Sequence, residues 1–189
     1  QVTFVFRFYR AVELSGTPTY VSPDVTGFWT SKEFMRFEYE VQLGERTYEV
    51  LETRTVLFPT VVGPRNIGQS LLVLPATGES PVQEFVTGPI PLEVKPLPEV
   101  APEGYQGAVG KFTISAVADT GESKIDDPIA MTVTLSGEGN IEAMPDPTWP
   151  NLPQWRSFEI EPIVTTGFND DTLTGNRVYE RMMVPVTSG

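Results

Sequence analysis

Hydrophobic and polar residues alternate with a period of two along much of this chain. The clearest run is 2–9, in which Val2, Phe4, Phe6 and Phe8 occupy every second position. This alternation is typical of a β-strand that turns one face to a core. We therefore predict a strand at 2–9 with an aromatic core face.

The same pattern predicts most of the other elements. Residues 36–43 and 46–58 flank Gly44-Glu45 and are predicted to form a β-hairpin. The other predicted strands are 66–74, 82–94 (one strand or two), 109–118, 129–135, 156–164 and 177–186. Segments 136–140 and 165–176 are rich in Gly, Ser, Thr and Asn and are predicted to be a turn and a loop, and only 30–34 is compatible with a single helical turn. An all-β chain of short strands and frequent turns is typical of β-sandwiches.

A proline-rich segment divides these strands into two groups. Pro96, Pro98 and Pro102 each remove a backbone donor, so this stretch is neither a helix nor a central strand. We predict an extended linker at 96–106 between a sandwich domain at 1–95 and a second at 107–189.

An internal repeat supports this division. A shift of 127 residues places 1–6 on 128–133 and Phe28 on Trp155, and a shift of 126 places Pro59 on Pro185. We interpret the chain as two copies of one domain. The first copy has no counterpart of 109–118, and the second has none of 66–94. We therefore expect unpaired sheet edges, which tend to bind other strands, and we expect these edges to pair with each other or with a neighbouring molecule in a lattice.

Composition excludes several classes of function. The 189 residues carry a net charge of −12, which argues against partners that need a basic surface, such as nucleic acid or anionic lipid. There is no cysteine and no histidine, so disulfides, thiolate chemistry and the commonest general base are absent. No apolar run reaches the roughly 18 residues of a membrane span.

Several segments stand out by their order and spacing: 1–9, 27–29, 48–63, 94–98 (VKPLP), 107–112 (GAVGKF), 127–128 and 135–140 (LSGEGN). Together they resemble the BatD family of bacterial oxygen-tolerance proteins of the cell envelope. The resemblance implies tandem immunoglobulin-like domains in an extracytoplasmic location, anchored to the membrane by a helix outside this chain. It also implies association with von Willebrand-type envelope proteins and a MoxR-type ATPase, and it carries no catalytic residues. Because the chain begins in a strand pattern, we expect it to be part of a longer protein.

Two aspartate pairs, Asp126-Asp127 and Asp170-Asp171, are candidates for calcium ligands, with Asp119 or Glu122 nearby. Aspartate is also a turn former, and no calcium-loop pattern is present, so we favour turns and expect no metal and no cofactor. A glycosidase needs only two carboxylates, but nothing in the sequence distinguishes one pair among 25 acidic residues.

The loop 149–155 combines aromatic residues with proline. Trp149 and Leu152, with Trp29 in the first copy, are candidates for a surface that binds a sugar or a protein partner. Trp155 aligns with Phe28 and is instead expected to fill the end of its sandwich. The sequence predicts a non-catalytic protein-interaction or scaffolding module. A carbohydrate-binding or adhesin-type module using Trp149 and Trp29 is the alternative, and a hydrolase a distant third.

Overall fold

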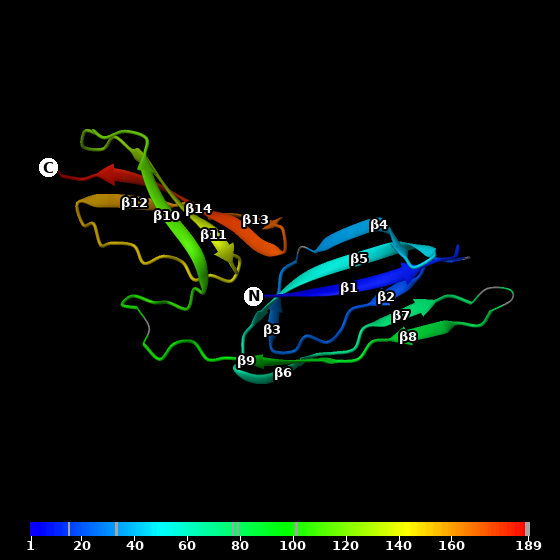
Figure 1. The fold of residues 1–189 in the computed structure, drawn as a ribbon. Coiled ribbons are helices and arrows are strands. Elements are labelled where there is room, and N and C mark those ends of the chain that lie inside the picture. Colours follow the sequence, from blue (N-terminus) through cyan, green and yellow to red (C-terminus); the bar gives the residue numbers. More distant parts are fainter. Residues whose placement is uncertain (15, 33, 77, 79, 101, 188–189) are drawn as a thin grey trace. The chain divides into compact units, whose positions relative to one another are not determined.

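A computed structural model describes residues 1–14, 16–32, 34–76, 78, 80–100 and 102–187. These residues form fourteen strands in antiparallel sheets and no helix, which confirms the all-β prediction (Figure 1). No helical turn is present at 30–34, where Glu33 lies outside the described residues. The chain divides into two compact units, Gln1–Val100 and Ala101–Gly189, and the division falls inside the predicted linker. They are called the first and second unit below.

A long strand forms the centre of one sheet in the first unit. The sheet contains β1 (Val2–Arg10), β3 (Phe28–Thr30), β4 (Met35–Leu43) and β5 (Arg46–Pro59). β1 pairs with one edge of β5, while β4 and β3 pair with successive parts of the other edge. The predicted hairpin at Gly44-Glu45 is confirmed, since β4 and β5 pair directly up to Leu43 and Arg46.

The remaining strands of the first unit are short. They are β2 (Thr19–Val21), β6 (Gly63–Ile67), β7 (Leu71–Leu74), β8 (Gln83–Val86) and β9 (Ile90–Val94). The predicted strand 66–74 is therefore split, but β6 pairs with β9 in the same register in which β7 pairs with β8. At the break, the Thr87 amide donates to the Ser70 carbonyl at 3.0 Å and the Ser70 amide donates to the Thr87 hydroxyl at 2.9 Å. The four strands are thus one long hairpin with an interruption.

The core of the first unit lies on the predicted aromatic face of β1. Phe6 is buried, and its ring centroid lies 4.2 Å from that of Tyr20 on β2, so it joins the two sheets. Leu57, Ile67 and Leu72 are buried as well. Phe4 and Phe8 are only half-buried. Burial of a side chain as completely as that of Leu57 or Ile67 stabilises the fold by about 2 kcal/mol.

The described residues of the second unit form one sheet. Its strands are β10 (Gly110–Ala118), β11 (Ile129–Gly139), β12 (Trp155–Glu159), β13 (Ile163–Asn169) and β14 (Thr172–Pro185). β11 lies between β10 and β14, and β12 and β13 both pair with β14. The loop 140–154 contributes Ile141 and Met144 to the core, where they are buried with Leu173 and Tyr179.

Three sequence predictions for this unit are wrong. Residues 136–139 continue β11, where Gly137 leaves room for Phe112 because a Cβ there would lie 2.7 Å from the phenylalanine ring. Residues 165–176 form a hairpin between β13 and β14 that turns at Asp170-Asp171. Asp170 has a φ of 52°, which two-residue hairpin turns require. Finally, 156–164 is divided between β12 and β13.

The strand pairing of the two units follows the predicted repeat. Val2 pairs with Leu57 as Ile129 pairs with Met183, and these positions are related by the shifts of 127 and 126. The Phe28–Pro59 and Trp155–Pro185 pairs are related in the same way. The two-residue turns at 44–45 and 170–171 also coincide under the shift of 126. β1, β3, β4 and β5 are therefore equivalent to β11, β12, β13 and β14.

Candidate interaction sites

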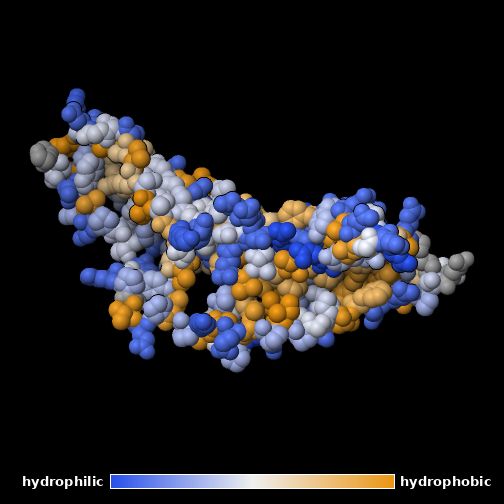
Figure 2. Space-filling model, in the orientation of Figure 1, coloured by the Kyte–Doolittle hydropathy of each residue, from blue (hydrophilic) through white to orange (hydrophobic). Residues whose placement is uncertain are grey.

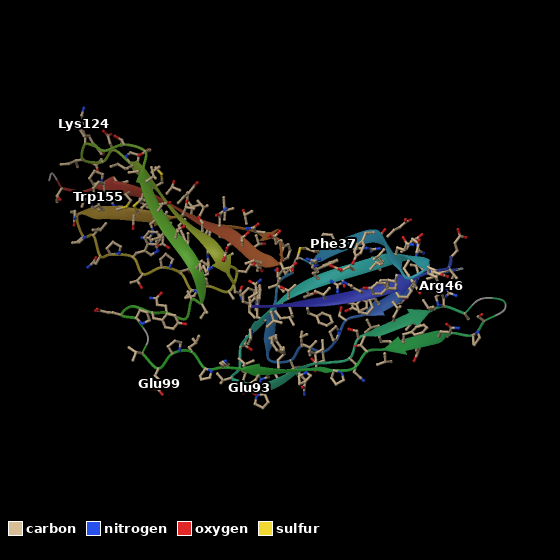
Figure 3. The ribbon with its side chains drawn as sticks, viewed as in Figure 1. Phe37, Arg46, Glu93, Glu99, Lys124 and Trp155 are labelled. Atoms are coloured by element: carbon tan, nitrogen blue, oxygen red, sulfur yellow. The ribbon has the colours of Figure 1, made fainter. Side chains whose placement is uncertain are left out.

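A cavity of about 230 Å³ lies beside the loop 149–155 in the second unit. Trp149, Leu152 and Trp155 line it together with residues of β11 and β14, among them Met131 and Arg181. Trp155 stands at the start of β12 (Figure 3). The structure thus brings Trp149 and Leu152 together as the sequence suggested. Trp155 is half-buried and faces this cavity rather than filling the sandwich end completely.

Trp149 is held by the sheet beneath it. The guanidinium carbon of Arg181 lies 3.7 Å from its ring centroid, and the Tyr179 ring meets it edge-on at 5.8 Å. Arg181 also forms an ion pair with Glu159. A cation over an indole face contributes about 1 kcal/mol where both groups are partly desolvated. One face of Trp149 is therefore used in packing, and the residue is half-buried.

Polar side chains of β14 fasten the rest of this loop. Arg177 donates to the Met144 carbonyl at 2.6 Å and to the Asp146 carboxylate at 2.7 Å. The Tyr179 hydroxyl donates to the same carboxylate at 3.1 Å. Burial, and then the hydrogen bond to Asp146, raise the pKa of Tyr179 to about 12 despite the nearby Arg177. These contacts hold residues 144–146 of the loop against β14.

Trp29 belongs to the first unit and has a different environment. It lies on β3, half-buried, with the ring of Phe58 5.8 Å away at an interplanar angle of 60°. The two rings are tilted, so together they do not form one flat platform for a sugar ring. Trp29 and Trp149 lie in separate units, and each is engaged with its own neighbours.

The sequence predictions missed a buried polar cluster in the first unit. Glu52 on β5 is 1% exposed and accepts hydrogen bonds from Arg7 at 2.5 Å, from Tyr39 at 2.9 Å and from Arg54. Arg54 also lies over the ring of Phe37, whose position on β4 is visible in Figure 3. Burial alone would raise the pKa of Glu52, but the bonds from Arg7, Arg54 and Tyr39 outweigh it and lower the pKa to about 2.

This arrangement favours structure over catalysis. The carboxylate is fully paired and remains ionised, whereas a general acid or base has a pKa near the working pH. A signal for the cluster was present in the sequence, since the alternation in 46–58 places Glu52 on the same side as Val50 and Val56. A charged residue at such a position requires buried partners.

The predicted aspartate pairs lie in turns. The Asp126 amide donates to the Pro185 carbonyl at 3.0 Å, and Asp126 has a φ of 66°. The Asp119 carboxylate accepts a bond from the Ala130 amide at 3.1 Å. Within the described residues, no three acidic side chains gather as a metal site would require. The turn interpretation accounts for each of these positions.

We expect millimolar calcium to leave the thermal unfolding of the chain unchanged. Calcium takes six to eight oxygen ligands, and a single aspartate pair in a solvated turn supplies too few. Differential scanning calorimetry with and without calcium measures this, with magnesium as the ionic control. A rise of several degrees specific to calcium would contradict the turn interpretation.

Apolar residues are also exposed along sheet edges of the first unit. Phe85 and Val86 on the edge strand β8 are 52% and 57% exposed. Figure 2 shows hydrophobic residues interspersed with hydrophilic ones on the surface of this unit. Edge strands with exposed apolar side chains are sites at which other chains bind.

None of the described residues belongs to a helix long and apolar enough to cross a membrane. Comparison with known proteins finds no matching family model, no matching curated protein and no matching solved structure.

Proposed function

We propose that this chain is a non-catalytic protein-interaction and scaffolding module of a membrane-anchored bacterial envelope protein of the BatD type, built from tandem immunoglobulin-like domains. The observation that carries the proposal is the open edge of β1. Among the residues that the structure describes, β1 pairs with β5 on one side only, whereas the equivalent β11 is paired on both sides. An open edge is a ready template for a strand from another chain.

The strand order of the first unit supports the immunoglobulin-like assignment. In an immunoglobulin domain, strands A, B, E and D form one sheet, and C, F and G form the other. In one sheet of the first unit, β1 is followed by β5 and then by β3 and β4, an order that is compatible with B, E and D. In another, β2, β7 and β8 follow an order compatible with C, F and G. In the second unit, the order β10, β11, β14 and β12 is compatible with A, B, E and D. The family assignment itself rests on the sequence segments that resemble BatD.

The side chains with unusual environments support a structural rather than a catalytic role. Glu52 is neutralised by Arg7 and Arg54, and Asp146 by Arg177. The partners proposed are therefore proteins, with von Willebrand-type envelope proteins as the first candidates and an extracytoplasmic location for the contact.

Binding of a purified von Willebrand-type envelope domain from the same cell tests this function. We expect biolayer interferometry with the immobilised chain to give saturable binding that weakens at least tenfold in Phe85→Glu/Val86→Glu or in Val5→Pro, which blocks the β1 edge. Val100→Glu, which adds the same charge at a position that is 85% exposed, is the control. Absence of binding to any envelope protein of this class would contradict the proposal.

The alternative is a carbohydrate-binding module, and one observation favours it. The cavity beside Trp149, Leu152 and Trp155 combines two indole rings with Arg181. A glycan array with the wild-type chain and Trp155→Ala distinguishes the two functions, because a sugar site loses its signal in this variant. The interaction module predicts no glycan signal in either protein.

A further inference from the structure

The repeat identifies what the open edge of β1 lacks. In the second unit, β10 covers the outer edge of β11 from the Ala118–Met131 pair to the Gly110–Gly139 pair. The shift of 127 carries Met131 to Phe4 and Ser136 to Tyr9. Among the described residues, β1 pairs with β5 alone, so the position equivalent to β10 is vacant beside Phe4–Tyr9.

We propose that the Phe4–Tyr9 edge of β1 is a strand-acceptor site, which binds an antiparallel strand of the β10 type donated by a partner protein other than a second copy of this chain. The proposal deepens the proposed function and rests on it, because it assigns the interaction to one edge and one kind of occupant. The second unit supports the proposal, because its equivalent strands have the same order and register and include such a strand, β10.

The β10 sequence describes the chemistry of the occupant. Directly opposed residues of an antiparallel pair share a face, so the residues opposite Phe4, Phe6 and Phe8 lie on the core side. In β10 the equivalent residues are Ala118, Ala116 and Ile114. Between them the strand carries Val117, Ser115 and Thr113. We therefore expect small or branched apolar residues on the core side, alternating with small polar or β-branched residues.

Arg7 constrains the outer side of the occupant. Its guanidinium is already bound to Glu52, so it does not require an acidic partner across the new pair. The equivalent position of β11 is Thr134, which faces Ser115. A small residue opposite Arg7 leaves the cluster undisturbed, whereas a lysine or arginine there would add a like charge.

The site ends at Tyr9 for a steric reason. The next residue of β10 is Phe112, whose ring lies against Gly137, where even a Cβ would meet the Lys111 carbonyl at 2.1 Å. The residue of β1 equivalent to Gly137 is Arg10. Arg10 carries a long side chain where Gly137 has none, so an aromatic residue equivalent to Phe112 does not fit opposite it, and we expect the occupant to pair with Phe4 to Tyr9.

Hydrogen exchange on an extended chain tests the proposal. In this variant, residues 113–127 are duplicated directly before Gln1, which reproduces the natural spacing because Pro128 aligns with Gln1. We expect the alternate amides of Phe4–Tyr9 that face away from β5 to exchange at least about tenfold more slowly than in the unextended chain. The amides of β11 serve as the internal reference.

A matched control carries Ile114→Asp and Ala116→Asp in the added segment alone, which places charges beside Phe8 and Phe6. We expect no added protection in the control. Unprotected β1 amides in the extended chain, or equal protection in the control, would overturn the proposal. Protection of β1 that rises with the concentration of the unextended chain would assign the edge to a second copy and would also overturn it. Partner binding by interferometry is a separate readout, so its failure would count against the proposed function while leaving the exchange result intact.

Discussion

Replacing Ile141 by alanine should destabilise the second unit by about 3 kcal/mol, the middle of the range for large-to-small changes in a core. Ile141 has no exposed surface, and its side chain lies over Gly175, where a Cβ would come within 2.7 Å of the isoleucine methyl. Ile141 begins the loop that covers the sheet of this unit. Its loss leaves a cavity between the loop and the sheet.

Thermal unfolding followed by circular dichroism, with residue-level exchange to separate the units, measures this effect. We expect the transition of the second unit to fall by roughly 15 °C while that of the first stays in place. Leu152→Ala, 36% exposed on the same loop, is the matched control and should change little. A small effect of Ile141→Ala would mean that the loop does not close the core.

Glu52→Gln should destabilise the first unit by about 2 kcal/mol, because it removes the charge that compensates two arginines. Arg7 and Arg54 keep some access to solvent, at 45% and 26% exposed, so the loss is smaller than for a fully buried pair. Glu38→Gln is the control, since Glu38 pairs with Arg36 at the exposed surface of the same sheet. Urea unfolding at pH 7 compares the three proteins.

The pH dependence of the same variant tests the cause. Glu52 has a pKa of about 2 in the folded chain against an ordinary value of 4.5, so its contribution is fully present above pH 4.5. It is lost as the pH falls towards 2. The stability difference between wild type and Glu52→Gln should therefore be constant near neutral pH and shrink between pH 4.5 and 2. A difference that persists unchanged at pH 2 would show that packing, not charge, accounts for it.

Local patterns predicted the strands where one face is apolar and the ends are marked. The Phe4, Phe6 and Phe8 alternation and the Gly44-Glu45 turn each encode their structure within a few residues. Local patterns did not predict the strand residues at 136–139 and 165–176, which are rich in Gly, Ser, Thr and Asn. These residues belong to strands because of what they meet across the sheet, such as the Phe112 ring beside Gly137.

The repeat held information that local patterns lacked. A shift of 126 residues places the turn at 44–45 on 170–171. This relation would have predicted the second hairpin. The candidate site was predictable only in part. Trp149 and Leu152 do line one cavity, but the hydrogen bonds and ion pairs of Glu52 depend on side chains from β1, β4 and β5. Such a convergence is fixed by strand register, which no single segment encodes.

The most direct test of this account compares the backbone amides of β1 and β11 in the unmodified chain by residue-resolved hydrogen exchange. β11 is paired on both edges, so all amides of Met131–Ser136 should be protected. Within the described part of the chain, β1 is paired on one edge, so alternate amides of Phe4–Tyr9 should exchange rapidly. Uniform protection of Phe4–Tyr9 in dilute solution would contradict the open acceptor edge on which the proposed function rests.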